Sequence, residues 1–166
     1  AMQHAQAIRG VSKDLKIMPV VVRESTPEKG MVWNRIVAKK LGAYIDDLVA
    51  VHFYSGNSTF RHKANDDIYA TIKMGDFLIG IATQGDPMSG LKERLNELMQ
   101  KSCDIIVCAS RSKGYTVDDV ENSALQNGYS LIWSSPFVTE DKILRETCQD
   151  YMAQSIINLI NGIAYV

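Results

Sequence analysis

The chain has 166 residues, of which 46% are hydrophobic and 22% are charged, a composition typical of one globular domain. Its 18 Lys and Arg residues against 19 Asp and Glu residues give a net charge of -1, which argues against general nucleic-acid binding. Because no apolar run approaches the roughly 20 residues of a membrane span, we expect a cytoplasmic protein that does not bind membranes.

The N-terminal stretch differs from the rest of the chain. It is polar and has no hydrophobic periodicity, and Ala1 before Met2 resembles the remnant of a cleaved expression tag. We therefore expect residues 1–15 to form a tag remnant and disordered arm, and residues 16–166 to form a single α/β domain.

The cysteines are odd in number and lack metal-binding spacing. Cys103, Cys108 and Cys148 form no CxxC pair and have no His nearby in the sequence. No zinc, haem or iron–sulfur cluster is therefore expected. Cys108 lies inside an apolar run, which predicts a small buried side chain with an unreactive thiol.

Short apolar runs alternate with segments of helical spacing along the domain. The predicted strands are Ile17–Val22, Leu48–Tyr54, Ile68–Lys73, Phe77–Ile81, Asp104–Ala109 and Tyr129–Trp133. Pro19 should restrict the first of them to a strand start or a sheet edge, because proline has no backbone N–H. The short connection at Met74–Asp76 indicates a β-hairpin.

Four helices are expected between or after these strands. The first contains Trp33, Ile36, Val37 and Leu41, the second begins after Ser89 as N-cap and carries Leu91, Leu95, Leu98 and Met99, and the third runs from about Thr116 to Gly128 with Val117, Val120, Ala124 and Leu125 facing inward. The fourth begins near Glu140, and its broad apolar face is predicted to be core: Ile143, Leu144, Cys148, Tyr151, Met152, Ile156, Leu159 and Ile160.

This alternation predicts a Rossmann-like, three-layer α/β fold. We expect a mostly parallel sheet of about five or six strands with one antiparallel hairpin and helices on both faces. In such sheets, ligands bind beyond the carboxyl ends of the strands, near the point where the strand order reverses. The loops to inspect are therefore 23–30, 55–62, 83–87, 110–116 and 134–137.

The loop from Arg23 to Gly30 joins the first strand to the first helix, where phosphate-binding α/β proteins hold their phosphate loop. Glu24 occupies the position of the first glycine, and the usual Gly-Lys pair is reversed as Lys29-Gly30. We predict an altered phosphate cradle formed by four residues of this loop. They are Ser25, Thr26, Lys29 and Gly30.

The layout, together with the segments Leu78–Asp86 and Cys103–Thr116, resembles small P-loop NTPase-like proteins with a degenerate Walker A loop. The resemblance implies a nucleotide or another phosphorylated ligand, bound with Mg²⁺. It also implies that Asp86 contributes to the Mg²⁺ site and that Arg111 and Lys113 lie near the phosphates.

Two other functions stay open. The segment from Gly114 to Glu121 is similar to a segment of nucleoside deoxyribosyltransferase-like and nucleotide N-glycosidase proteins, which implies Glu121 as nucleophile or base. Asp118 would lie one turn earlier on a similar helix face. The chain could instead be a non-catalytic interaction module that has kept the fold and lost the site, and homo-oligomerisation is also left open.

Overall fold

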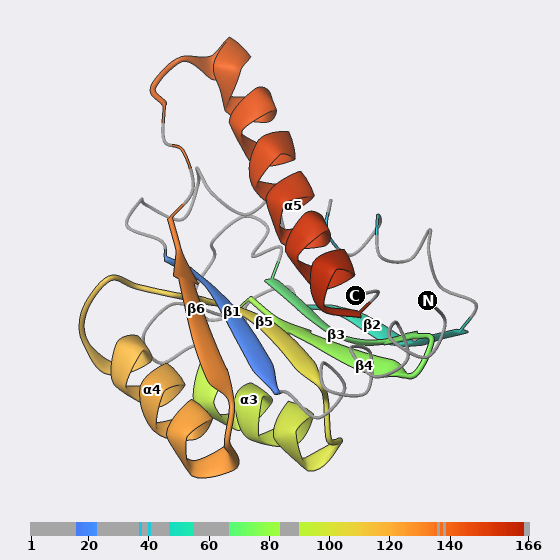
Figure 1. Ribbon diagram of the computed structural model, residues 1–166. Coiled ribbons are helices and arrows are strands. Elements are labelled where there is room, and N and C mark those ends of the chain that lie inside the picture. Colours follow the sequence, from blue (N-terminus) through green and yellow to red (C-terminus); the bar gives the residue numbers. More distant parts are fainter. Residues whose placement is uncertain are drawn as a thin grey trace.

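A six-stranded mixed sheet forms the centre of the protein (Figure 1). The computed structural model describes residues 16–22, 37, 40, 47–54, 67–83, 90–135, 137 and 139–164. The strands are β1 (Ile17–Val22), β2 (Asp47–Tyr54), β3 (Asp67–Met74), β4 (Phe77–Ala82), β5 (Ile105–Ser110) and β6 (Ser130–Ser134). Their order across the sheet is β2-β3-β4-β5-β1-β6. The predicted α/β fold class is confirmed, whereas the predicted arm over residues 1–15 lies outside the described residues.

The sheet has a parallel half and an antiparallel half. β4, β5, β1 and β6 are parallel neighbours, and the predicted hairpin is the pair β3–β4, closed where Met74 pairs with Phe77. Gly75 in its turn has φ of 58°, a conformation that glycine adopts without a Cβ clash. β2 extends the antiparallel half because it also pairs antiparallel with β3.

Pro19 lies in an interior strand, which corrects the prediction of a strand start or sheet edge. β1 pairs with β5 on one side and with β6 on the other. Its pairing with β6 includes Pro19, whereas its pairing with β5 passes from Ile17 directly to Val20. The missing N–H of proline is therefore accommodated by a local interruption in the pairing between β1 and β5.

Helices α3 (Leu91–Gln100) and α4 (Tyr115–Asn127) cover one face of the sheet (Figure 1). Leu95 and Leu98 of α3 and Val120 and Ala124 of α4 pack with Val20 of β1 in one buried cluster. The residue at the N-cap of α3 is Gly90, with φ of 89°, and not the predicted Ser89, which lies outside the described residues.

One inward position predicted for α4 is wrong. Leu125 is 82% exposed, whereas the buried positions are Thr116, Val120, Ser123 and Ala124. These four recur at intervals of four, three and one, so they form one narrow stripe, and Leu125 lies about 100° beyond Ala124 around the helix.

The opposite face is covered by α5 (Lys142–Ala164). Met152, Ala153, Ile156, Ile157 and Ile160 pack into a second cluster with residues of β1, β3, β4 and β5, and Val37 joins it. Val37 and Lys40 are helical, and Lys40 Nζ donates to Gln154 Oε1 of α5 at 2.7 Å. The rest of the predicted first helix lies outside the described residues.

The N-terminal half of α5 projects beyond the sheet (Figure 1). Ile143 is 85% exposed, Leu144 52% and Tyr151 61%, so the prediction that these three belong to the core is wrong. Ile143 and Leu144 lie in the first turn of α5, which has no sheet opposite it, and helical periodicity carries no information about where the sheet ends. Tyr151 directly precedes the buried Met152 and Ala153, and it lies on the opposite side of the helix from the stripe to which they belong. No helix in the described part of the chain is long and apolar enough to cross a membrane.

Candidate functional site

The connections of β1 and β5 leave the sheet in opposite directions. From β1 the chain continues to β2, at one end of the strand order, whereas from β5 it continues through α4 to β6 at the other end. β1 and β5 are adjacent and parallel, so the strand order reverses between them. In open α/β sheets this position, beyond the carboxyl ends of the two strands, is the usual ligand-binding crevice.

The register brings the ends of three strands to one level. Val22, the last residue of β1, pairs with Ser110, the last residue of β5. Ser134, the last residue of β6, pairs with Val21, and its hydroxyl donates to the carbonyl oxygen of Val20 at 3.1 Å. The two loops that the sequence analysis singled out, 23–30 and 110–116, therefore follow paired strand ends.

A hydroxyl network holds the connection from β5 to α4. The backbone N–H of Arg111 donates to Thr116 Oγ1 at 3.1 Å, and Ser110 Oγ lies 3.3 Å from the same oxygen. Ser110 Oγ also donates to the carbonyl oxygen of Arg111 at 2.9 Å. Both hydroxyl residues are buried, at 0% and 2% exposure, so these bonds fix where the loop leaves the strand and where the helix begins.

Among the described residues, no side chain caps the N-terminus of α4. Gly114 occupies the N-cap position with φ of 94°, and its carbonyl oxygen accepts hydrogen bonds from the amides of Val117 and Asp118. By helix geometry, the amides of Tyr115 and Thr116 point out of the helix start, where the helix dipole is positive. Such an end can accept the oxygens of an anion in place of a capping side chain.

Two cationic side chains belong to this loop. Arg111 is half-buried, and Lys113 is exposed immediately before Gly114. The structure therefore brings these two predicted site residues together at the start of α4, within one short connection. A guanidinium, an ammonium and the amides of a helix start are donors that suit a phosphate group.

The other predicted members of the phosphate site lie outside the described residues. These are Ser25, Thr26, Lys29, Gly30 and Asp86. The Mg²⁺ site expected at Asp86 therefore stays a prediction. Among the residues that the structure describes, no cluster of three His, Cys, Asp or Glu side chains is arranged to hold a metal ion.

Glu121, the candidate for glycosidic chemistry, lies in the second turn of α4. Glu121 and Asp118 are both exposed, so they share the solvent side of the helix as their spacing predicts. The buried stripe of α4, which contains Thr116 and Val120, faces the sheet instead. Glu121 therefore lies outside the network of Ser110, Arg111 and Thr116.

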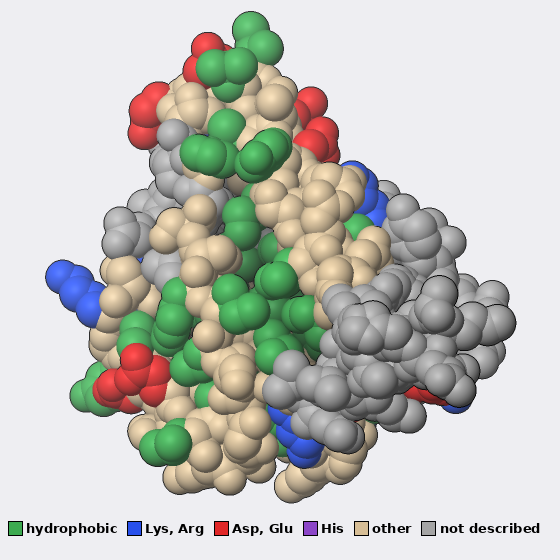
Figure 2. Space-filling view, viewed as in Figure 1, with side chains coloured by type: hydrophobic (Ala, Val, Ile, Leu, Met, Phe, Trp, Pro, Cys, Tyr) green, Lys and Arg blue, Asp and Glu red, His purple; other side chains and the backbone are tan. Residues whose placement is uncertain are grey.

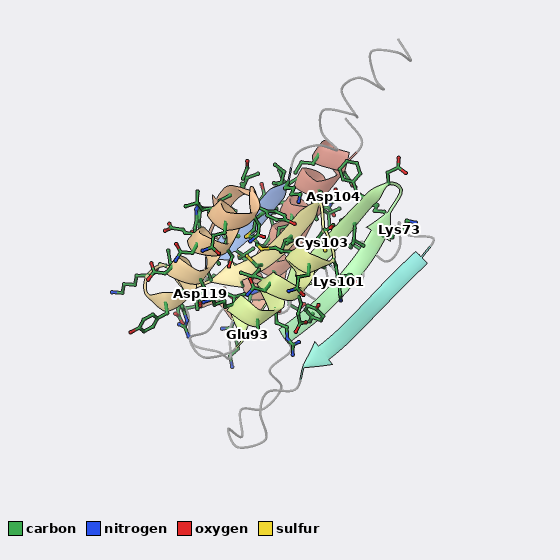
Figure 3. The ribbon with its side chains drawn as sticks, turned by 90° about the horizontal axis from the view of Figure 1, so that it is seen from below. Lys73, Glu93, Lys101, Cys103, Asp104 and Asp119 are labelled. Atoms are coloured by element: carbon green, nitrogen blue, oxygen red, sulfur yellow. The ribbon has the colours of Figure 1, made fainter. Side chains whose placement is uncertain are left out.

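Cys108 lies in the middle of β5 and has no exposed surface. Burial raises the pKa of its thiol from 9.0 to about 12, which matches the predicted buried position. Cys103 is also buried, and desolvation raises its pKa to about 12. It lies with Lys101 and Asp104 between the end of α3 and the start of β5 (Figure 3). This is the amino end of β5, whereas the candidate site lies at its carboxyl end.

Sequence reasoning missed three buried hydroxyl residues near the carboxyl ends of β4 and β5. Thr83, Ser110 and Thr116 are each at most 2% exposed, and Thr83 and Ser110 lie at the carboxyl ends of β4 and β5. A usable signal was present, because each of these two follows an apolar run directly. Polar residues at strand ends are common, however, and only the strand order reveals that the two strands are neighbours.

Comparison with known proteins gives no relative: no family model, curated protein or solved structure matches the chain.

Proposed function

We propose that the protein binds a nucleotide or another phosphorylated small ligand where β1 and β5 end, with phosphate oxygens at the start of α4. The observation that carries this proposal is the uncapped helix start at Gly114, which follows a loop with Arg111 and Lys113 at the reversal of the strand order. The predicted phosphate cradle at residues 23–30 lies outside the described residues, but it follows β1, which ends beside β5.

The chemistry of the loop favours an anion over a neutral ligand. The helix dipole and the two cationic residues of this connection, Arg111 and Lys113, all favour negative charge near the start of α4. The hydroxyl network leaves the loop preorganised, so little conformational entropy is lost on binding. We propose binding alone and assign no hydrolytic step.

Lys113→Ala tests this proposal. We expect thermal stabilisation of the unmodified protein by ATP or pyrophosphate, measured with and without Mg²⁺, because a ligand that binds only the folded state raises its stability. Removing the Lys113 charge should weaken the affinity by about three- to tenfold, the effect of one exposed charged contact. Lys92→Ala is the matched control, because Lys92 is also exposed but lies on α3.

Three outcomes would count against the proposal. If neither ligand shifts the melting temperature, or if Lys113→Ala and Lys92→Ala weaken binding equally, the loop is not a phosphate site. Release of free base from nucleotides that disappears in Glu121→Gln would instead support the N-glycosidase alternative, since this isosteric change removes a nucleophile or base.

A further inference from the structure

In the part of the chain that the structure describes, β6 forms one edge of the sheet and pairs only with β1. β6 is the last strand in the order, and its sequence is Ser130-Leu131-Ile132-Trp133-Ser134, with no charged residue and no proline. Ile132 is 36% exposed and Trp133 40% exposed. Figure 2 shows hydrophobic side chains at the surface over the β1–β6 side of the sheet, beside α5. Strands of this kind tend to pair with another chain.

The opposite edge strand, β2, differs in the features that hinder such pairing. It begins with Asp47, contains His52 and has a register irregularity between Leu48 and Ala50. Bulges and charged residues are common devices against edge-to-edge association. β6 pairs with β1 in an unbroken register from Ser130 to Ser134 and has none of these devices.

The backbone groups of β6 that face outward can be identified. The N–H of Ser130 donates to the carbonyl oxygen of Lys16 at 2.7 Å, so the backbone of Ser130 faces β1. Because backbone groups alternate along a strand, those of Leu131 and Trp133 face the free edge. Two N–H and two C=O groups therefore point away from the sheet, two residues apart.

This arrangement is self-complementary. If two copies of β6 pair antiparallel about a twofold axis at Ile132, Leu131 of each copy lies opposite Trp133 of the other, and the two outward-facing residues exchange four backbone hydrogen bonds. Ser130 then faces Ser134, and Ile132 faces its own copy. The pattern polar-apolar-apolar-apolar-polar reads the same in both directions, so every pair in this register joins similar chemistry.

The side chains also match across this pair. Leu131 packs against the core on the α3–α4 face, so Trp133 lies on that face and Ile132 on the face of α5. The register thus puts two Leu–Trp pairs on one face and an Ile–Ile pair on the other. α4, which contacts β6, also exposes Leu125 at 82% on the Leu–Trp side of the sheet.

We propose that a second copy of this chain pairs antiparallel with β6, so that two sheets join into one continuous sheet centred on Ile132. The partner is a second copy because β6 is complementary to itself. The carboxyl end of β6, at Ser134, then lies beside the amino end of its partner. Because each candidate ligand site lies at the carboxyl ends of its own strands, the two sites face opposite directions along the strands of the joined sheet. A variant that prevents dimerisation is therefore not expected to affect phosphate binding, and the two properties can be tested separately.

Variants that introduce either a positive or a negative charge at position 132 test the register of the pair. Sedimentation of the unmodified protein between about 1 μM and about 1 mM should give a dimer whose dissociation constant rises at least about tenfold in Ile132→Lys and in Ile132→Glu. Each variant puts a charge directly opposite the same charge. Mixing the two variants should restore the dimer, because only this register places position 132 against itself. Lys142→Glu, which changes an exposed charge on α5, is the control and should leave the dissociation constant unchanged.

Disulfide cross-linking tests the same register without a measurement of the dimer's dissociation constant. Under mild oxidation, Ile132→Cys should form a disulfide dimer, because Cα atoms in such a pair are about 4.5 Å apart, whereas Ser130→Cys should not. The unmodified protein, with its own three thiols, is the background control. A monomer at every concentration would overturn the proposal, and so would a dimer that persists in both charged variants or fails to return on mixing. Circular dichroism of each variant establishes that it is folded.

Discussion

Cys108, Ser110 and Thr116 are all buried, but they differ in their hydrogen bonds. Cys108 has no exposed surface, whereas the hydroxyls of Ser110 and Thr116, a few residues later, are buried but hydrogen-bonded to the loop that leaves the sheet. The apolar neighbours of Cys108 were sufficient to predict its burial. The roles of Ser110 and Thr116 could not be predicted, because they depend on how the chain turns after β5.

Cys108 should resist alkylation in the folded protein. Its pKa is raised to about 12 by burial, and the thiolate fraction at neutral pH falls about tenfold for each unit by which a pKa is raised. We expect iodoacetamide, followed by mass spectrometry, to label Cys108 about 1000-fold or more slowly in the native than in the unfolded chain. Cys148, which is partly exposed, is the internal control and should be modified first. Modification of Cys108 at the same rate as Cys148 without unfolding would contradict this expectation.

At the scale of elements, helix contacts explain both the successes and the errors of sequence reasoning. α3 was predicted correctly because its buried residues recur at helical spacing and the sheet lies opposite its whole length. For α5 the same reasoning gave a helix but overextended its buried face, because Ile143 and Leu144 lie on the part that projects past the sheet. Local periodicity thus predicts the type of an element, whereas the extent of its burial depends on its partner.

Gly80 fixes how closely α3 approaches β4, and its substitution tests this contact. A Cβ at Gly80 would lie 2.9 Å from Leu98 Cδ1 and 3.1 Å from Cys103 Sγ. We expect Gly80→Ala to lower the free energy of unfolding by about 1–3 kcal/mol, the cost of overpacking a dense core. The matched control is Gly162→Ala in α5, where a Cβ meets nothing within 4 Å.

That control should instead raise stability by about 0.5–1 kcal/mol, because alanine favours a helix interior over glycine. Urea titration of both variants measures the difference. Equal effects of the two substitutions would mean that the contact between α3 and β4 is looser than the structure describes.

On the scale of the whole molecule, one sheet supplies two separate features. The strand order places a polar, basic loop at the carboxyl edge between β1 and β5, and leaves the apolar strand β6 at a lateral edge. The alternation of strands and helices was enough to predict the fold class and to name the loop of Arg111 and Lys113. The position of β6 at the edge could not be predicted, because a short apolar run is equally typical of an interior strand.

Amide chemical shifts measured by NMR during a titration with pyrophosphate show where on the protein phosphate binds. We expect saturable shifts at the amides of residues 111–116, where the loop after β5 enters α4, and smaller shifts near Ser134 at the adjacent strand end. The chemical shifts of the amides of residues 101–104, which lie at the amino end of β5, should stay unchanged. Shifts confined to residues 101–104, or no saturable shift anywhere in the loop, would mean that phosphate does not bind at the start of α4.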